Sequence, residues 1–142
     1  PSFVKEADRI RCRVQTKTSF KFGIKARESR GAMAYLNDST APATLLVCRF
    51  KVAEESRYAE YPCDAPSDTG YMQQFYVDDG TFGGFGELEY HTPALESGKR
   101  ESVTDRCEVW AFAGAATALR PLIDRMARDK RPWAAASGIS GQ

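Results

Sequence analysis

The chain has 142 residues, 42% of them hydrophobic and 27% charged, and its 20 Lys and Arg side chains nearly balance 19 Asp and Glu. This composition is typical of a folded globular protein and excludes a disordered, collagen-like or coiled-coil chain. The length is that of one ordinary domain, which we expect over residues 1–131. No apolar stretch is long enough to span a bilayer, and residues 1–20 lack the apolar core of a signal peptide, so a membrane is not an expected partner.

Basic residues are concentrated near the start of the chain. Residues 1–30 carry nine basic and three acidic side chains, whereas residues 31–119 carry six and fourteen. The basic residues alternate with apolar or small ones, as on the solvated face of a sheet. Because no aromatic platform and no nucleic-acid-binding motif accompanies them, nucleic acid is not an expected partner.

The first half of the chain is predicted to form strands separated by turns, because its hydrophobic residues recur with a period of two. Polar residues with Gly or Pro break this pattern at 28–31 and 37–42. Rising polarity and several prolines then predict a long loop over 53–70. The predicted strands are Ile10–Thr16, Phe20–Ala26, Ala32–Leu36 and Thr44–Val52.

Three further strands are predicted in the second half. An Asp78-Asp79-Gly80 turn separates the first two of them, and residues 93–104 connect the second to the third. The strands are Tyr71–Val77, Phe85–His91 and Arg106–Phe112. Seven strands followed by a helix predict a mainly β protein, an antiparallel β-sandwich with one C-terminal α-helix.

The period changes to that of a helix after Gly114. Leu119, Leu122, Ile123 and Met126 lie at i, i+3, i+4 and i+7 and form one apolar stripe. Thr117 is the predicted N-cap, and Pro121 would then lie near the first turn. Ser, Gly and Ala residues predict a flexible tail over 132–142.

The four cysteines do not form a metal-binding pattern. Cys12, Cys48, Cys63 and Cys107 are widely spaced, and His91 is the only histidine. A zinc site is therefore not expected, and no motif predicts a cofactor. Cys12, Cys48 and Cys107 lie in apolar strand-like runs, where free cysteines are expected to be small buried hydrophobes.

The strand Phe85–His91 carries the candidate site. Its alternation places Phe85, Glu87, Glu89 and His91 on one face and Tyr90 on the other. Two carboxylates beside an imidazole suit general acid–base chemistry, although a solvated face with two exposed acids has the same pattern. Aromatic rings and carboxylates also recognise sugars, and the candidate sugar-binding residues are Tyr76, Asp79, Phe85 and Tyr90.

The run GGFGELEYHTPAL, followed by ESGKRESVTDRCEVWAFAG and ATALRPLIDRM, resembles the C-terminal half of aldose 1-epimerase-like proteins in bacterial branches of the galactose mutarotase-like supersandwich superfamily. The resemblance covers roughly residues 71–126. The residues that match the motifs of these proteins are Gly84, Phe85, Glu87, Leu88, Glu89, Pro93, Ala94, Gly114, Ala118, Leu119, Pro121 and Leu122.

The resemblance implies a carbohydrate-binding protein. Glu89 matches the mutarotase base, which removes the proton of the anomeric hydroxyl, while a histidine earlier in the family's chain protonates the ring oxygen. This chain has no histidine before His91. The alternatives are an epimerase or other sugar-processing enzyme completed by upstream sequence, and a non-catalytic structural or interaction sandwich.

The resemblance also implies a longer protein. A supersandwich has on the order of twice this length, within the range of large all-β domains. We therefore expect the chain to be the C-terminal half of such a domain, and its exposed sheet edges to favour self-association.

Overall fold

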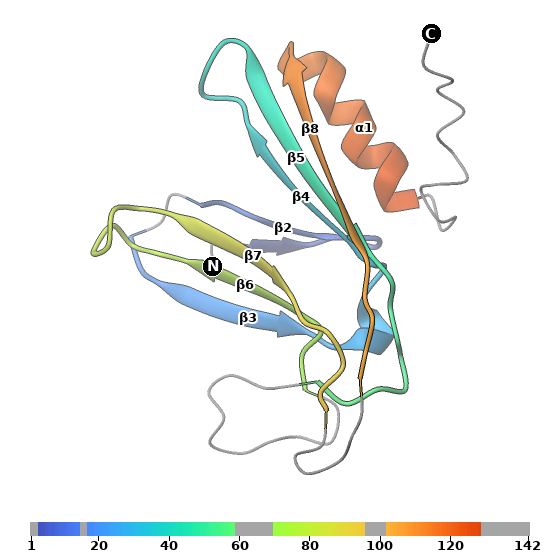
Figure 1. Ribbon diagram of the computed structural model, residues 1–142. Coiled ribbons are helices and arrows are strands. Elements are labelled where there is room, and N and C mark those ends of the chain that lie inside the picture. Colours follow the sequence, from blue (N-terminus) through green and yellow to red (C-terminus); the bar gives the residue numbers. More distant parts are fainter. Residues whose placement is uncertain (1–2, 15–16, 59–69, 96–101, 129–142) are drawn as a thin grey trace, which may run out of the picture. The chain divides into compact units, whose positions relative to one another are not determined.

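The computed structural model describes residues 3–14, 17–58, 70–95 and 102–128. These residues form eight β-strands, one short 3-10 helix and one α-helix near the C-terminal end (Figure 1). All strand pairs are antiparallel and form three sheets, so the expected mainly β, sandwich-like class with one C-terminal helix is confirmed. The tail expected over 132–142 and residues 59–69 of the expected loop lie outside the described residues.

The chain divides into two compact units, each made of two chain segments. The first unit comprises Pro1–Ser29 and Lys51–Arg106, and the second comprises Arg30–Phe50 and Cys107–Gln142. Within the part of the chain that the structure describes, no helix has the length and apolar character needed to cross a membrane.

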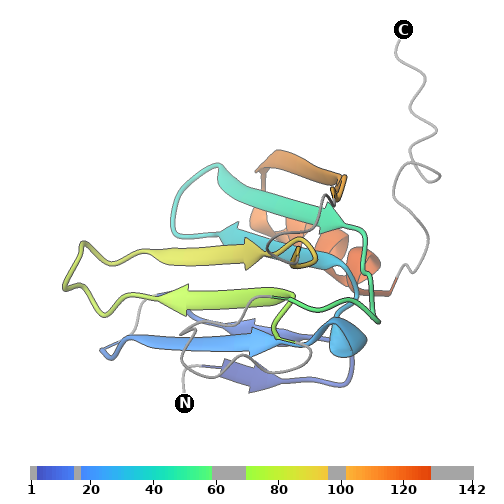
Figure 2. The same ribbon diagram turned by 60° about the horizontal axis from the view of Figure 1, so that its bottom comes forward.

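The first unit is a two-layered β structure. Its larger sheet has the order β3-β6-β7 (Figure 2), and its smaller one is a hairpin of β1 and β2. The ring centroids of Phe3, in the hairpin, and Phe22 are 5.7 Å apart, and those of Phe22 and Phe75 are 5.5 Å apart. The hairpin therefore packs on one face of the larger sheet. The strands are β1 (Phe3–Lys5), β2 (Ile10–Cys12), β3 (Phe20–Ile24), β6 (Gln73–Val77) and β7 (Gly86–Tyr90).

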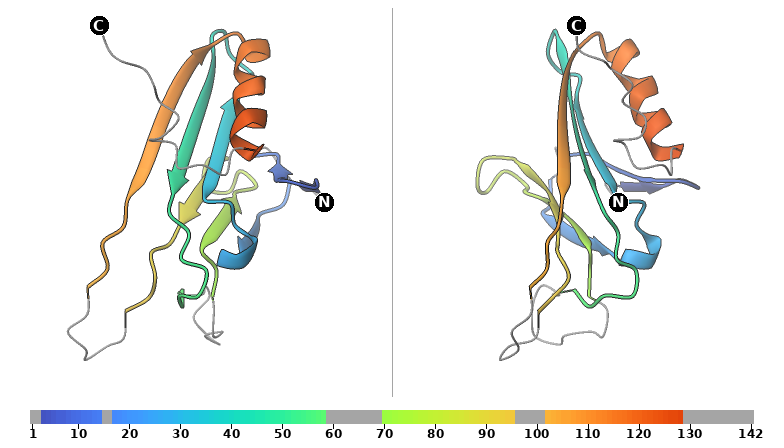
Figure 3. Two further views of the ribbon diagram at one scale, coloured as in Figure 1. Left: turned by 90° about the vertical axis from the view of Figure 1, so that its right-hand side faces the viewer. Right: turned by 45° about the vertical axis from the view of Figure 1, so that its right-hand side comes forward.

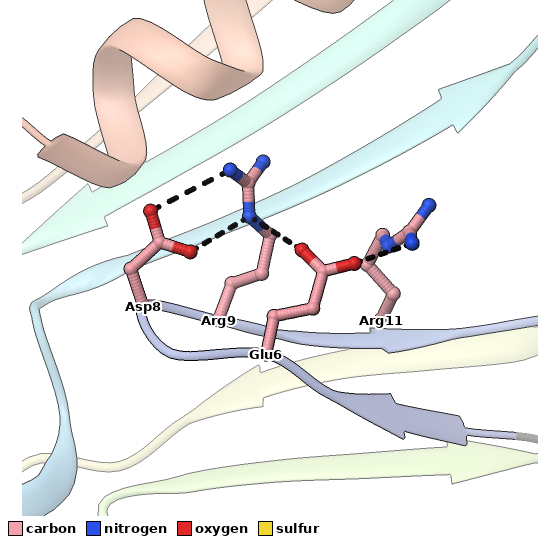
Figure 4. Close-up of polar contacts among 4 residues, drawn as sticks. All are labelled: Glu6, Asp8, Arg9 and Arg11. Carbon is pink, nitrogen blue, oxygen red and sulfur yellow. Dashed lines mark hydrogen bonds and ion pairs between the residues drawn. The ribbon is translucent and has the colours of Figure 1, made fainter.

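An ion-pair network stabilises the turn of the β1–β2 hairpin (Figure 4). The Arg9 Nε atom lies 3.1 Å from both Glu6 Oε2 and Asp8 Oδ1. Arg11 pairs with the other oxygen of Glu6. Arg9 and Arg11, two of the basic residues expected on a solvated face, are thus compensated by acids of the same hairpin, and the local charge is smaller than the count of basic residues implies.

The second unit is a three-stranded sheet covered on one face by the helix. The sheet order is β4-β5-β8, and α1 lies along it (Figure 3). The predicted helical stripe is confirmed, because Leu119 and Met126 are buried against the sheet and Leu122 and Ile123 pack beside them. The elements are β4 (Ala32–Asn37), β5 (Ala43–Phe50), β8 (Cys107–Gly114) and α1 (Ala116–Arg128).

The start of α1 differs from the sequence prediction. The helix begins at Ala116, and the Ala115 carbonyl accepts hydrogen bonds from the N–H groups of Ala118 and Leu119. Thr117 is therefore inside the first turn and is not the N-cap, and Pro121 lies in the helix interior. Pro121 has no N–H to donate to the preceding turn, so packing of the apolar stripe on the sheet outweighs the loss of that bond.

The other differences are at strand ends. The strand expected over 10–16 is shorter, since β2 ends at Cys12, and β3 ends at Ile24 before the 3-10 helix η1 (Ala26–Glu28). The sequence did not predict β1, whose three residues are all exposed and show no alternation of burial.

Candidate functional site

The larger sheet of the first unit has one apolar face and one polar face. Strand register aligns Lys21 with Tyr76 and Gly23 with Gln74 across β3 and β6. It also aligns Tyr76 with Glu87 and Gln74 with Glu89 across β6 and β7. Since side chains alternate along a strand, these residues share the face opposite the one that the hairpin covers. We call this surface the polar face, and it consists of Lys21, Gly23, Gln74, Tyr76, Glu87 and Glu89, with His91 just beyond the end of β7.

Glu89 is held between two nitrogen-bearing side chains. Its Oε1 atom lies 3.4 Å from Lys21 Nζ, and its Oε2 atom lies 3.4 Å from His91 Nε2. Lys21 comes from β3 and Glu89 from β7, so their ion pair crosses the central strand β6. The three side chains are 25–29% exposed and therefore remain within reach of a ligand.

The polar face contains buried polar atoms without a partner. Gln74 is only 2% exposed, and neither its Nε2 nor its Oε1 atom has a hydrogen bond within the described residues. The Nδ1 atom of His91 is buried without a partner in the same way. Leaving such groups unsatisfied costs about 1–3 kcal/mol each, so they favour a bound molecule that supplies the missing donors and acceptors.

Aromatic rings lie on the same face. The Tyr71 ring lies so close to Gly23 that a Cβ atom added there would be 2.2–2.7 Å from three of its carbons. Gly23 is therefore the residue that lets this ring lie directly on the sheet. The ring centroids of Tyr76 and Phe85 are 5.8 Å apart. Rings and hydrogen-bonding groups thus occur side by side on one surface.

A tight turn after β6 fixes the end of this face. Oδ2 of Asp78, which is 1% exposed, accepts hydrogen bonds from the backbone N–H groups of Gly80, Phe82 and Gly84, each at 3.0 Å. The exposed Asp79 accepts from the Thr81 hydroxyl and backbone N–H, and these two bonds lower the pKa of the Asp79 carboxyl. Asp79, a candidate sugar-binding residue, is thus engaged within the turn.

The structure brings together only some of the residues that the sequence singled out. Glu89 and His91 are in contact, and Glu87 lies on the same face but is exposed. Tyr76 and Phe85 are also in contact, whereas Tyr90 is in register with Gln73 and points to the opposite face.

Two hydrogen-bonding side chains of the polar face, those of Gln74 and Lys21, were missed by sequence reasoning. Gln74 could have been found as a polar residue within the apolar run 71–77. Lys21 could not have been found in this way. A solvated lysine and a lysine paired across the sheet alternate with apolar residues in the same pattern. Only the order β3-β6-β7 brings it to Glu89.

The polar face is not built as a metal centre. Among the described residues, no group of three or more His, Cys, Asp and Glu side chains is close enough to hold a metal ion.

Comparisons with models of protein families, with curated proteins and with solved structures found no match to this chain.

Proposed function

We propose that the polar face of the β3-β6-β7 sheet binds a carbohydrate. The observation that carries the proposal is the buried Gln74 amide, whose donor and acceptor atoms are both unsatisfied within the described residues. A sugar presents adjacent hydroxyl groups that donate and accept, and these are the partners that an amide and a carboxylate require. The resemblance of residues 71–126 to the mutarotase-like proteins supports the same ligand class.

Each part of the polar face has a role in this proposal. Glu89 accepts hydrogen bonds from sugar hydroxyls, and Gln74 both donates and accepts. Lys21 holds the carboxylate in place across β6 at 3.4 Å. The Tyr71 ring offers a flat apolar surface for a pyranose face, an arrangement that aromatic side chains commonly provide.

The geometry favours binding over catalysis. Mutarotation needs a base on the anomeric hydroxyl and an acid on the ring oxygen, on different atoms of the sugar. His91 follows the end of β7, two residues after Glu89, and the two side chains contact each other at 3.4 Å, so they approach a ligand from the same side. Glu89 would also have to leave its ion pair with Lys21 in order to act as a base. Catalysis completed by upstream residues remains the alternative proposal.

A glycan-binding screen and polarimetric mutarotation of several aldoses test the proposal. Wild type is compared with Glu89→Gln and with Gln74→Met, which removes the amide at similar volume. We expect each substitution to weaken binding at least about tenfold, since each removes hydrogen bonds in a desolvated site. The matched control is Glu55→Gln, which removes an exposed ion pair with Arg27 elsewhere in the first unit.

Two outcomes contradict the sugar site. One is that wild type binds no sugar, and the other is that Glu89→Gln binds as tightly as wild type and Glu55→Gln. If wild type catalyses mutarotation and Glu89→Gln does not, the alternative proposal of an enzyme would be favoured. Absence of both activities would favour the structural or interaction sandwich.

A further inference from the structure

We propose that Cys48 and Cys107, in the second unit, form a dithiol site that hydrogen peroxide oxidises reversibly to an intrachain disulfide. The register of β5 and β8 places Cys48 opposite Val109 and Cys107 opposite Phe50. The two cysteines are therefore diagonal neighbours on adjacent strands and lie on the same face. That face is the one turned away from α1, because the alternate residues Leu45 and Val47 pack in the core beneath the helix.

The two thiols are in contact and differ in accessibility. A side-chain hydrogen bond joins Cys48 and Cys107, and both are free thiols. Cys107 is exposed, whereas Cys48 is partly buried. Burial, together with the neighbouring Cys107, raises the pKa of the Cys48 thiol. Cys107 is therefore the thiol that meets an oxidant first, and Cys48 is the one that resolves the product.

The position of Cys107 allows the bond to close. Diagonal residues on antiparallel strands have Cα atoms about 7–8 Å apart. A disulfide requires about 4.4–6.8 Å, so the two backbones must approach by on the order of an ångström. Cys107 is the first residue of the edge strand β8, where the ladder ends and the backbone can shift without breaking pairs on both sides.

The reaction proceeds in two steps that balance. The Cys107 thiolate attacks one peroxide oxygen, the O–O bond breaks, and the released hydroxide takes up a proton to give water, leaving a sulfenic acid on Cys107. The Cys48 sulfur then attacks the Cys107 sulfur, the S–O bond breaks, and the hydroxyl leaves as water with the proton of the Cys48 thiol. Two thiols lose two electrons in total, and one hydrogen peroxide is reduced to two water molecules.

Non-reducing peptide mapping of the full chain tests this site. Reduced protein is treated with hydrogen peroxide, remaining thiols are alkylated, and the digest is analysed by mass spectrometry. We expect one peptide pair that contains Cys48 and Cys107, lighter by two hydrogens than the separate peptides and released by a phosphine reductant. The chain should stay monomeric on a non-reducing gel. The matched variant Cys12→Ser, Cys63→Ser keeps only the proposed pair and should lose both of its thiols to oxidation.

Single substitutions test the order of the steps. In Cys48→Ser we expect a sulfenic acid that dimedone traps on Cys107, and in Cys107→Ser we expect much slower oxidation of Cys48. The proposal is overturned if peroxide leaves Cys48 and Cys107 both alkylatable, if Cys107 is oxidised to the sulfinic acid without a cross-link, or if either cysteine pairs with Cys12 or Cys63. The mapping of wild type decides these outcomes even if a variant fails to fold.

Discussion

Gly23 lies at a position of the polar face where there is no space for a side chain. A Cβ atom at this position would lie 2.2 Å from Cγ of Tyr71, well inside van der Waals contact. We expect Gly23→Ala to displace the Tyr71 ring and to destabilise the protein by about 1–3 kcal/mol, the usual cost of overpacking. Urea unfolding measures this change in free energy.

The control for Gly23 is Gly114, in β8, because nothing lies within 4 Å of a Cβ atom placed there. Gly114→Ala should leave stability unchanged or raise it by up to about 1 kcal/mol. When Tyr71 is already replaced by alanine, adding Gly23→Ala should cause little further loss of stability. The double variant Gly23→Ala, Tyr71→Ala is therefore compared with Tyr71→Ala alone. A penalty that persists without the Tyr71 ring would refute the steric explanation.

A second prediction at the residue scale concerns Cys12 and the pH dependence of stability. Burial raises the pKa of its thiol from 9.0 to about 11. A raised pKa in the folded state means that the folded protein holds the proton more tightly than the unfolded chain. The stabilisation is therefore complete below pH 9 and is lost progressively as the pH rises from about 9 to about 11.

Unfolding in urea with a reductant present, from pH 8 to pH 11, checks the prediction for Cys12. The free energy of unfolding should decline more steeply in wild type than in Cys12→Ala, whose residue 12 does not titrate. Thr44→Ala, which changes an exposed residue of β5 with no titratable group, is the control and should decline as wild type does. Equal slopes in wild type and Cys12→Ala would show that Cys12 keeps its ordinary pKa in the folded state.

At the scale of elements, the β6–β7 turn depends on one carboxylate. Asp78 Oδ2 accepts three backbone hydrogen bonds, and the side chain is 1% exposed. Hydrogen bonds to a charged group contribute about 1.5–3 kcal/mol each. Because these three share one acceptor, we expect Asp78→Ala to cost at least about 3 kcal/mol.

The neighbouring Asp79→Ala is the control for Asp78. Asp79 is exposed, and its carboxyl accepts hydrogen bonds from Thr81 and Ser19 in contact with water, so its loss should be much less destabilising. Thermal unfolding followed by circular dichroism compares the two variants. Equal losses in the two variants would contradict the central role assigned to Asp78.

Strands can be predicted from the sequence where their residues are alternately buried and exposed. The prediction fails for a strand whose residues do not alternate in this way. In β5, Ala43, Leu45 and Val47 are buried and the residues between them are exposed, so the period of two is visible. In β1 all residues are exposed and the signal is absent. The candidate site follows the same rule, since Glu89 and His91 are only two residues apart in the chain, whereas Lys21 reaches Glu89 only through strand order. Pairing across a sheet between distant segments leaves no local pattern in the sequence.

Cys107 shows the limit of composition as a guide to burial. Its apolar run predicts a buried thiol, but this prediction is wrong, because the residue is exposed. β8 is an edge strand, and α1 covers only one of its faces. A strand that packs on one side exposes every second residue, whether that residue is polar or not.

At the scale of the whole molecule, exposed apolar residues on an edge strand predict self-association. Val109 of β8 is 67% exposed, and Leu46 of the adjacent β5 is 46% exposed on the same face. An edge strand can pair with an edge strand of another molecule, and antiparallel pairing of one β8 with another would bury Val109. We therefore expect the protein to associate reversibly as its concentration rises.

Sedimentation velocity over a range of concentrations measures this association. A lysine on an edge strand opposes pairing through its charge and the cost of desolvating it. Val109→Lys should therefore weaken the dimer at least about tenfold, or about 1.4 kcal/mol. Val4→Lys places the same charge on β1, where Val4 is 56% exposed, and should leave association unchanged. A wild-type protein that is monomeric at every concentration, or a dimer weakened equally by both substitutions, would show that β8 is not the associating edge.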